Sequence, residues 1–549
     1  MSCPLDPSGL PGPLRRRRSL SALQSGVFDI LVVGGGSVGT GIALHAAARG
    51  LLVALVELDD FGGGTSGRST KLVHGGVRYL ERAVLRADLA EYRLVLEALR
   101  ERGAFFRLAP HLTRPLAILT PAYSLWSRLY YGAGLAIYDM VSGNASLGAT
   151  RHLAAPAALD RFPALDSRGL RGAVLYYDGQ FDDARFNVAL ALTASALGAV
   201  VVNHAAVIAL IKEGARVIGA QVRDGLSGAT LTVRARSVIN ATGPFADRLR
   251  ALDEPAATPL LRPSGGIHLV LRPGLCPDHT GLLIPKTSDG RVVFVLPWLG
   301  HTLIGTTDRP EDPAEHPAVR TEDVDYLLQL VNRHVSTPLR REDVRSAWSG
   351  QRPLVRNPTR AHTAALSRSH IVVESAAGLV TVAGGKWTSY RRIATDAVEY
   401  VLRQQGLRAR PAAAASERVL IGGDGFSENL VREVQQRRAL PADVATHLGH
   451  AYGDRMEAVC TLAGQEWMQR LAPQHPYLEA EVVWAVREES ALRVMDVLAR
   501  RTRLAFLDRA VARSCVTRVA QLMGAELGWS AAHQRTEELE ALAQLDGDM

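Results

Sequence analysis

FDILVVGGGSVGTGIALHAAARGLLVALVE, residues 28–57, is the stretch that decides the fold. It begins with an apolar run, 28–33, of the length expected for a buried parallel strand. A helical segment follows over 40–49, and LLVALV predicts a second strand that ends at Glu57. The G-x-G-x-x-G turn between the first strand and the helix contains Gly34, Gly36 and Gly39. This strand–turn–helix–strand order predicts a Rossmann-like α/β domain.

The glycine turn and the acidic residue after it have the chemistry of a dinucleotide site. The glycines permit a tight turn and let the backbone approach a pyrophosphate at the positive end of the helix. The carboxylate of Glu57 can accept hydrogen bonds from an adenosine ribose. Glycine-rich turns are common, so the turn by itself is weak evidence. Because the strands, the helix and the terminal acid all agree with it, the unit predicts a dinucleotide site.

The next segment, FGGGTSGRSTKLVHGGVRYL at 61–80, favours FAD over NAD. An NAD domain would usually proceed to a third strand here, whereas this loop offers backbone amides and hydroxyls that can surround a pyrophosphate and a flavin. The alternative is a flexible surface loop. Against it stands the concentration in this loop of Lys71, His74, Arg78 and Tyr79. The candidate cofactor contacts here are Thr65, Ser66, Ser69, Thr70, Lys71 and Leu72.

Length and composition limit the class of protein. The 549 residues allow two or three domains, and 47% hydrophobic with 21% charged residues is typical of a soluble globular protein. The net charge of +8 suits an anionic substrate, an anionic cofactor or an acidic lipid surface. Nucleic acid is not favoured, because the basic residues are dispersed without a nucleic-acid motif. No apolar run approaches the roughly 18–20 residues of a spanning helix, so any membrane contact is expected to be peripheral.

The cysteine pattern gives no sign of a metal. Cys3, Cys276, Cys460 and Cys515 lie far apart without paired spacing, so neither a disulfide framework nor a zinc site is expected. We therefore predict no bound metal.

The first 26 residues are rich in Pro, Gly and Ser and contain an arginine run at 15–18. Segment 1–26 is either a disordered leader or a mitochondrial targeting segment, which is Arg-rich and poor in acids. Its prolines disfavour the amphipathic helix that a targeting segment needs.

Nine stretches in order along the chain resemble the FAD-dependent glycerol-3-phosphate dehydrogenases, especially the mitochondrial type. They are GTSGRSTKLVHGGVRYL, YYDGQFDDARFNVALALTASALGA, VINATGPFAD, PSGGIHLV, TSDGRVVFVLPW, IGTTD, AWSGQRPLV, VAGGKWTSYR and RRTRLAFLD. YYDGQFDDAR, IGTTD and GGKWTSYR are far more specific than a glycine turn. Because the stretches cover nearly the whole chain, chance agreement is negligible.

The resemblance implies further contacts to FAD. A small turn at 241–243 lets backbone meet the cofactor, and Val207 is placed against the adenine end through its backbone. A strand over 379–382 leads through two glycines into a helix that starts near Trp387, whose N-terminus would stabilise negative charge on the reduced flavin. The residues assigned to FAD in these turns are Ala241, Gly243, Gly384, Gly385, Lys386 and Thr388.

The resemblance also implies a phosphate-bearing substrate. A phosphate dianion requires several fixed guanidinium groups, and an isolated arginine is more often a surface charge. The residues aligned with the substrate site of the family are Arg78, Tyr79, His268, Arg352, Arg368 and Lys386. Among them, His268, Arg352 and Lys386 are the candidate catalytic residues.

Two residues are candidates for the base that takes the substrate hydroxyl proton. His268 is preferred, because the ordinary pKa of imidazole, about 6.5, suits the task. Lys386 can act instead if burial beside arginines lowers its pKa. A structural histidine without a catalytic role is the alternative for His268.

The predicted fold class is α/β with an added α part. It consists of a discontinuous FAD-binding domain of the glutathione-reductase/amino-acid-oxidase type, an antiparallel-sheet substrate domain and a C-terminal helical cap. After the leader, the predicted division is FAD-binding at 27–110, a helical membrane-proximal insert at 111–169, FAD-binding at 170–261, the substrate sheet at 262–370, FAD-binding at 371–407 and the cap at 412–549.

The expected activity is oxidation of sn-glycerol 3-phosphate to dihydroxyacetone phosphate by hydride transfer from C2 to flavin N5, with electrons passed to a membrane quinone. The apolar, aromatic segment 115–141 is predicted either to contact the bilayer or to be a core helix, and quinone use favours contact. The expected address is the mitochondrial inner membrane in a eukaryote or the cytoplasmic face of the cell membrane in a bacterium. A homodimer is possible. No EF-hand loop occurs in the sequence.

Two other functions stay open at this point. A flavoenzyme of the same fold can act on an amino or hydroxy acid, although three aligned arginines argue for phosphate. A flavin-binding sensor without catalysis is the second alternative, although every aligned active-site residue is present.

Overall fold

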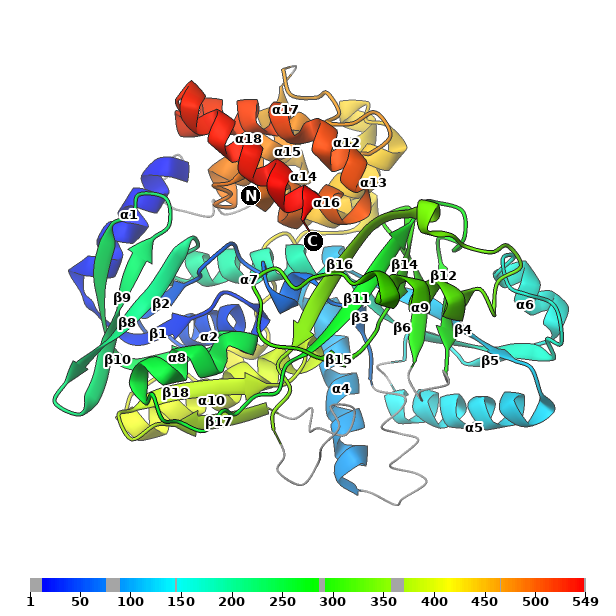
Figure 1. Ribbon diagram of the computed structural model, residues 1–549, viewed down its shortest axis with the longest axis horizontal. Coiled ribbons are helices and arrows are strands. Elements are labelled where there is room, and N and C mark those ends of the chain that lie inside the picture. The colour runs from blue at the N-terminus through cyan, green and yellow to red at the C-terminus, as the bar shows by residue number, and fades with distance from the viewer. Residues whose placement is uncertain are drawn as a thin grey trace.

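The computed structural model describes residues 12–75, 89–143, 146–285, 292–356, 370–464 and 466–547. Two β-sheets lie side by side below a group of C-terminal helices (Figure 1). None of the described helices is long and apolar enough to cross a membrane.

The first sheet has eight strands in the order β17-β18-β10-β1-β2-β7, with β9 paired to β10 and β8 to β9. β18, β10, β1, β2 and β7 are parallel, as expected of a Rossmann-like sheet. The strand bounds are β1 Val27–Val33, β2 Val53–Val56, β7 Val200–Val202, β8 Ala205–Glu213, β9 Arg216–Asp224, β10 Thr230–Asn240, β17 His370–Glu374 and β18 Leu379–Gly384. The strands and helix predicted from 28–57 are confirmed.

Three helices pack together beside this sheet: α2 Ser37–Ala48, α7 Asp183–Ala196 and α10 Tyr390–Gln405. α2 is buried along almost its whole length, between α7 and α10. Gly41 makes this possible, since a Cβ there would lie 2.8 Å from the ring of Tyr390. Short helices η4 Gly243–Phe245 and α8 Ala246–Asp253 follow β10.

The second sheet has ten strands in the order β15-β11-β14-β13-β12-β4-β6-β3, with β16 paired to β11 and β5 to β6. It is antiparallel apart from the β4–β12 pair. The bounds are β3 Leu72–Val73, β4 Thr113–Ala122, β5 Arg151–Leu153, β6 Gly172–Phe181, β11 Ser264–Leu271, β12 Thr280–Ile284, β13 Val293–Trp298, β14 His301–Gly305, β15 Arg309–Pro310 and β16 Val344–Arg352.

This sheet draws on more of the chain than the predicted segment 262–370. β4 lies in the segment 111–169 that was predicted to be a helical insert, and β6 lies in 170–261, which was assigned to FAD binding. Among the described strands, these two form the longest pairing, from Thr113–Phe181 to Ala122–Gly172. An apolar run such as PLAILT suits a buried strand as well as a helix, and only its pairing with a distant strand decides which forms.

The remaining helices surround the sheets and build the cap. Around the second sheet lie α4 Leu89–Leu108, η2 Pro110–Leu112, α5 Leu125–Ser142, α6 Ala155–Arg161, α9 Thr321–Val331 and η5 Arg341–Asp343. After α11 Ala413–Ser416, the cap contains α12 Glu428–Arg438, α13 Ala442–Tyr452, η8 Gly453–Arg455, α14 Met456–Ala463, α15 Glu479–Glu488, the π-helix η9 Asp496–Arg501, α16 Leu504–Leu507, α17 Arg509–Leu527 and α18 Ala531–Asp546.

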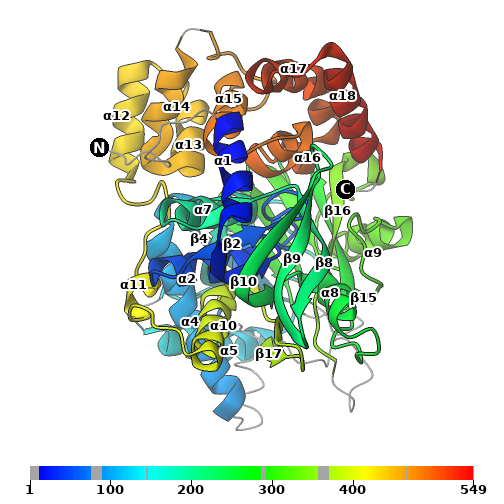
Figure 2. The ribbon, with the colours of Figure 1, turned by 90° about the vertical axis from the view of Figure 1, so that its left-hand side faces the viewer.

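Part of the predicted leader is ordered. Residues 12–25, expected to be disordered or to belong to a targeting segment, form α1 Gly12–Ser25, which runs from the first sheet up to the cap (Figure 2). Leu23 is fully buried, and Arg16 forms an ion pair with Asp224 at 2.6 Å. Its proline, Pro13, lies in the first turn, where proline is tolerated because the backbone N–H there has no partner within the helix.

Candidate functional site

The predicted pyrophosphate turn leaves no room for side chains. Gly34 has φ +109°, and a Cβ there would lie 2.6 Å from the carbonyl oxygen of Ala241. A Cβ on Gly39 would lie 1.8 Å from the carbonyl oxygen of Gly34. Gly36 caps α2 without a side-chain hydrogen bond. The first turn of α2 therefore presents its backbone at the carboxyl end of β1, where a pyrophosphate fits.

Glu57 lies at the end of β2 and faces the same turn. Its carboxylate accepts hydrogen bonds from the backbone N–H groups of Gly35, at 2.5 Å, and Asp59, at 2.9 Å. Burial raises its pKa to about 7, although these two hydrogen bonds act in the opposite direction. Hydrogen-bond donors such as ribose hydroxyls favour the ionised form, so a bound dinucleotide would lower this pKa.

The loop after β2 is buried and hydrogen-bonded, which contradicts the flexible-loop alternative over its described part, 61–75. The Thr65 hydroxyl donates to the carbonyl oxygen of Gln351 at 2.6 Å. The Ser69 hydroxyl donates to Asp183 at 2.8 Å, and the Thr70 hydroxyl lies 2.9 Å from Nε2 of His268. Ser66 and Leu72 are buried. The loop thus joins the first sheet to the second.

Lys71 holds this loop in place. Its ammonium group is fully buried and donates to Asp183 at 2.6 Å and to the carbonyl oxygen of Gly67 at 3.0 Å. It also lies within 5.3 Å of the ring centroids of Trp298 and Trp348. Burial lowers its pKa to about 7, and Asp183 opposes that change. Lys71 therefore fixes the shape of the loop that is predicted to contact FAD.

The second glycine turn lies against the same loop. Gly384 and Gly385 have φ of +81° and +82°, which favours glycine at both positions. They lead into η7 Trp387–Ser389 and then α10. Trp387 Nε1 donates to the carbonyl oxygen of Ser66 at 2.8 Å, and Thr388 is buried. The N-terminal end of this helical segment, which starts at Lys386, is thereby fixed beside the loop at 61–75, called the flavin loop below.

The remaining predicted cofactor residues lie at the same edge of the first sheet. The backbone N–H of Ala241 donates to the carbonyl oxygen of Val33 at 2.8 Å, and Gly243 follows at φ +58°. Val207 lies in β8, two residues after Ala205, whose N–H donates to the carbonyl oxygen of Glu57 at 2.7 Å. Strand β8 therefore passes the ribose end of the site, where the adenine contact of Val207 was predicted.

His268 lies on β11, opposite Gly305 on one side and Trp348 on the other. Its ring stacks on Trp348 with centroids 5.3 Å apart, and its buried Nδ1 has no hydrogen-bond partner among the described residues. Burial, together with the positive charges of Lys71 and Arg352, holds its pKa well below the usual value. The imidazole is therefore neutral, with one nitrogen available to a ligand.

Arg352 ends β16 near His268. Its guanidinium group donates to the Thr306 hydroxyl at 3.1 Å and lies 3.4 Å from Asp308, and it remains partly exposed. Lys386 belongs to the other sheet's side of the site, where it follows β18 and precedes η7. Three predicted substrate residues, Arg78, Tyr79 and Arg368, lie outside the described residues.

Sequence reasoning missed three residues that position the site. Asp183 accepts the hydrogen bonds of Ser69 and Lys71, and Asn187 donates to the carbonyl oxygen of Gly35 at 2.7 Å. Arg503, between η9 and α16, reaches the carbonyl oxygen of Gly67 at 2.7 Å. All three lie in YYDGQFDDARFN or RRTRLAFLD, stretches that carried the family resemblance but received no role.

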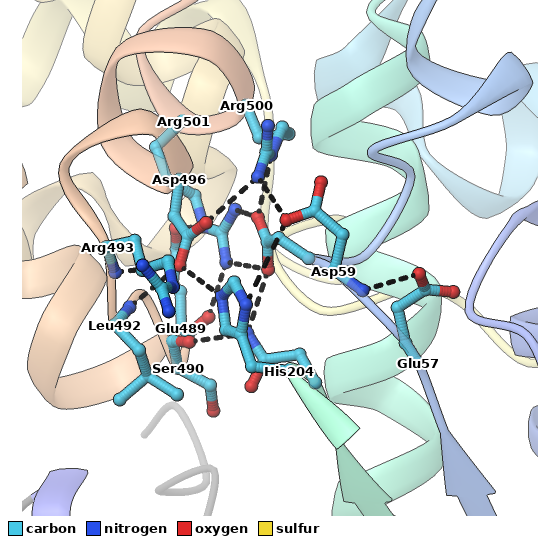
Figure 3. A network of polar contacts seen from close by, with 12 residues as sticks. Glu57, Asp59, His204, Glu489, Ser490, Leu492, Arg493, Asp496, Arg500 and Arg501 are labelled. Atoms are coloured by element: carbon cyan, nitrogen blue, oxygen red, sulfur yellow. Dashed lines mark hydrogen bonds and ion pairs between the residues drawn. The ribbon is translucent and has the colours of Figure 1, made fainter. Parts of the chain in front are cut away.

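A buried ionic network joins the cap to the ribose end of the site (Figure 3). His204 lies 2.9 Å from Asp496, and Arg500 binds both Asp496 at 2.9 Å and Asp59 at 3.3 Å. Arg501 donates to Asp60 at 2.6 Å. Asp496 and the other carboxylates outweigh burial and raise the pKa of His204, so its charge completes the network.

Three features together define an FAD-dependent oxidoreductase. They are the two glycine turns, the buried Glu57 at the expected ribose position, and the helical segment that begins after the second turn. Residues 29–391 match the FAD dependent oxidoreductase family, and residues 414–534 match the C-terminal domain of alpha-glycerophosphate oxidase. FAD is the cofactor, as predicted.

Relatives narrow this class to one family. The chain is 46% identical to a probable mitochondrial glycerol-3-phosphate dehydrogenase of Caenorhabditis elegans over 99% of this chain and 76% of that protein. Identity to the human mitochondrial enzyme is 44%, over 98% of this chain and 76% of that protein. The FAD complex of glycerol-3-phosphate dehydrogenase from Bacillus halodurans superposes with a TM-score of 0.80, at 28% identity and 98% coverage of both chains. The chain belongs to the FAD-dependent glycerol-3-phosphate dehydrogenase family, and the predicted fold class and family are confirmed.

Proposed function

We propose that this protein oxidises sn-glycerol 3-phosphate to dihydroxyacetone phosphate and delivers the electrons to a membrane quinone. Bound FAD supplies the acceptor for the hydride that leaves C2. The observation that carries the proposal is the buried His268, whose Nε2 lies 2.9 Å from the Thr70 hydroxyl and whose pKa is held well below its usual value by burial. This geometry supports a proton acceptor between the loop at 61–75 and the second sheet.

His268 is the proposed base, and Arg352 the proposed anchor of the phosphate. The charges of Lys71 and Arg352 oppose protonation of His268, and the dianionic phosphate would offset them when substrate binds. Substrate binding would thus make protonation of His268 more favourable, so that it can take the C2 hydroxyl proton. Lys386 remains the alternative base. Arg78, Tyr79 and Arg368 complete the proposed phosphate and glycerol contacts.

The proposal is tested by adding glycerol 3-phosphate anaerobically to the FAD-loaded protein. We expect the absorption band of oxidised flavin to bleach, because the substrate donates two electrons to it. Glycerol should fail to bleach the band at the same concentration, since it lacks the phosphate that Arg352 is proposed to bind. Bleaching by an amino acid or another hydroxy acid instead would refute the proposal, and no bleaching by any donor would indicate a non-catalytic flavin protein.

α5 is the proposed membrane contact. Trp126, Leu129 and Met140 are 79%, 64% and 74% exposed on this helix, whereas Leu135 and Tyr138 on its other face are buried. An amphipathic helix with exposed aromatic and aliphatic side chains suits the bilayer interface. α5 and the cap lie at opposite ends of the molecule (Figure 1). The protein would therefore bind the membrane with its substrate sheet nearest the lipid.

We expect the double substitution Trp126→Ser and Met140→Ser to reduce binding to vesicles of mixed neutral and anionic phospholipid by more than about tenfold, because two large apolar side chains no longer enter the interface. Cosedimentation measures this binding. Leu539→Ser is the matched control, since Leu539 is 68% exposed on α18, at the other end. Unchanged cosedimentation of the double variant would refute this surface.

The relatives named mitochondrial suggest a mitochondrial location. A peripheral position at the inner membrane, where quinone is available, follows from the proposed α5 contact. A homodimer stays a prediction.

A further inference from the structure

Three side chains from distant parts of the sequence meet where the second sheet touches the cap. His301 begins β14, His475 lies in the loop before α15, and Asp508 caps α17. One nitrogen of each imidazole and one carboxylate oxygen all lie within 4.8 Å of one another. His475 is buried and the other two are half-buried, so the cluster is shielded but reachable.

The orientation of both imidazole rings is fixed. Nδ1 of His301 lies 3.1 Å from the carbonyl oxygen of Leu299, which can only accept, so Nδ1 carries the proton and Nε2 keeps its lone pair. The ring of His475 lies parallel to that of His301, with centroids 5.6 Å apart. The same ring also stacks on Tyr477, with centroids 5.8 Å apart. A histidine whose second nitrogen donates to a carbonyl is the usual arrangement of a metal ligand.

One oxygen of the Asp508 carboxylate accepts no hydrogen bond from the described residues. The other oxygen of Asp508 accepts the N-cap hydrogen bond from Val511 at 3.1 Å. Among the described residues, no lysine or arginine forms an ion pair with Asp508 within 4.0 Å. The negative charge is therefore not neutralised within this part of the chain.

A second cluster of similar composition shows what an unsuitable site looks like. Asp59, His204 and Asp496 also bring their ligand atoms together, but Arg500 lies among them and His204 has a raised pKa (Figure 3). In that cluster, the positive charge of Arg500 already occupies the place that a metal ion would take. In the cluster of His301, His475 and Asp508, by contrast, no lysine or arginine of the described residues forms an ion pair with the carboxylate.

We propose that His301, His475 and Asp508 bind one zinc-class divalent transition metal ion, with water as the fourth ligand. Zinc–nitrogen distances of about 2.0–2.1 Å place tetrahedral ligand atoms about 3.3 Å apart, so modest side-chain movements close the site. Two imidazoles and one carboxylate select first-row transition metals over Mg²⁺ and Ca²⁺, which prefer oxygen ligands.

The ion would connect the substrate sheet to the cap. His301 is paired across the β13–β14 hairpin with Trp298, which packs against Trp348 at 5.6 Å, and Trp348 stacks on His268. Asp508 follows Phe506, which packs against Trp348 at 4.9 Å. A bound ion would therefore stabilise the packing of Trp298, Trp348 and Phe506 behind His268 without contacting the substrate.

The test is titration of the FAD-loaded protein with Zn²⁺, followed by gel filtration and metal analysis. We expect one Zn²⁺ retained per chain, a higher thermal midpoint, and visible absorption bands of tetrahedral Co²⁺ when cobalt is substituted. His301→Gln and Asp508→Asn should each weaken Zn²⁺ binding by more than about tenfold, as expected for loss of a ligand. Asp508→Asn keeps the helix cap, since asparagine caps as well as aspartate.

His279→Gln is the matched control, because His279 is an exposed histidine of the same sheet region and belongs to neither cluster. It should bind Zn²⁺ like the unmodified protein, and all variants should keep FAD. Retention of less than one Zn²⁺ per chain by the unmodified protein, or undiminished binding by both ligand variants, would overturn the proposal.

Discussion

Flavin reduction by glycerol 3-phosphate is expected to slow by about 10²–10⁴-fold when His268 is replaced by Gln, the range typical of a lost general base. The amide of Gln can still contact Thr70, which lies 2.9 Å from Nε2 of His268, so the flavin loop should keep its shape. Gln cannot accept a proton from the C2 hydroxyl. The loss should therefore appear in the rate at saturating substrate.

Anaerobic stopped-flow reduction measures this rate, with FAD content and substrate affinity as controls. Both controls should match the unmodified protein, because Arg352 and the glycine turns are untouched. The pH dependence of the rate should also lose the ionisation that belongs to His268. Reduction of the variant at the ordinary rate would remove His268 from the mechanism and leave Lys386 as the base.

Gly39→Ala is expected to release FAD, lowering its affinity by more than about 100-fold, because the pyrophosphate turn must open. The new methyl group would lie 1.8 Å from the carbonyl oxygen of Gly34, a backbone atom that cannot move without displacing the turn. Overpacking of this kind costs about 1–3 kcal/mol of stability. In an unhindered helix the same substitution stabilises by about 0.5–1 kcal/mol.

Gly134→Ala is the matched control, because Gly134 also lies in a helix, α5, and a Cβ there meets nothing within 4 Å. The flavin content per chain and the thermal midpoint are the measurements. The control should keep its FAD and gain slightly in stability. Full FAD occupancy in Gly39→Ala would mean that the turn does not hold the pyrophosphate.

Local sequence patterns predicted the elements around the cofactor well. The run 28–57 contains a strand, a glycine turn, a helix and a second strand within 30 residues, so its pattern depends on near neighbours alone. The strand predicted at 379–382 likewise lies within β18, Leu379–Gly384. Backbone conformations that favour glycine, such as those of Gly34 and Gly384, can be predicted from the glycines themselves.

The predictions were wrong where an element depends on a distant partner. The run 113–122 is a strand because 172–181 pairs with it, and neither run is distinctive without the other. The disordered-leader alternative was wrong for 12–25, because burial of Leu23 and the Arg16–Asp224 ion pair stabilise helix α1. His301, His475 and Asp508 lie far apart in the sequence, so cysteine spacing gives no indication that they meet.

The sequence by itself determined the dinucleotide turn, the choice of FAD and the family, because these depend on short runs whose residues meet in order. Only the tertiary structure decided how His268 is kept neutral, since Lys71, Arg352 and Trp348 reach it from three separate segments. It also decided that Arg503 of the cap supports the flavin loop, and that His301, His475 and Asp508 meet. The physical reason is the same in each case: burial and charge act through space, and distances in space between remote segments are set by the packing of the whole chain.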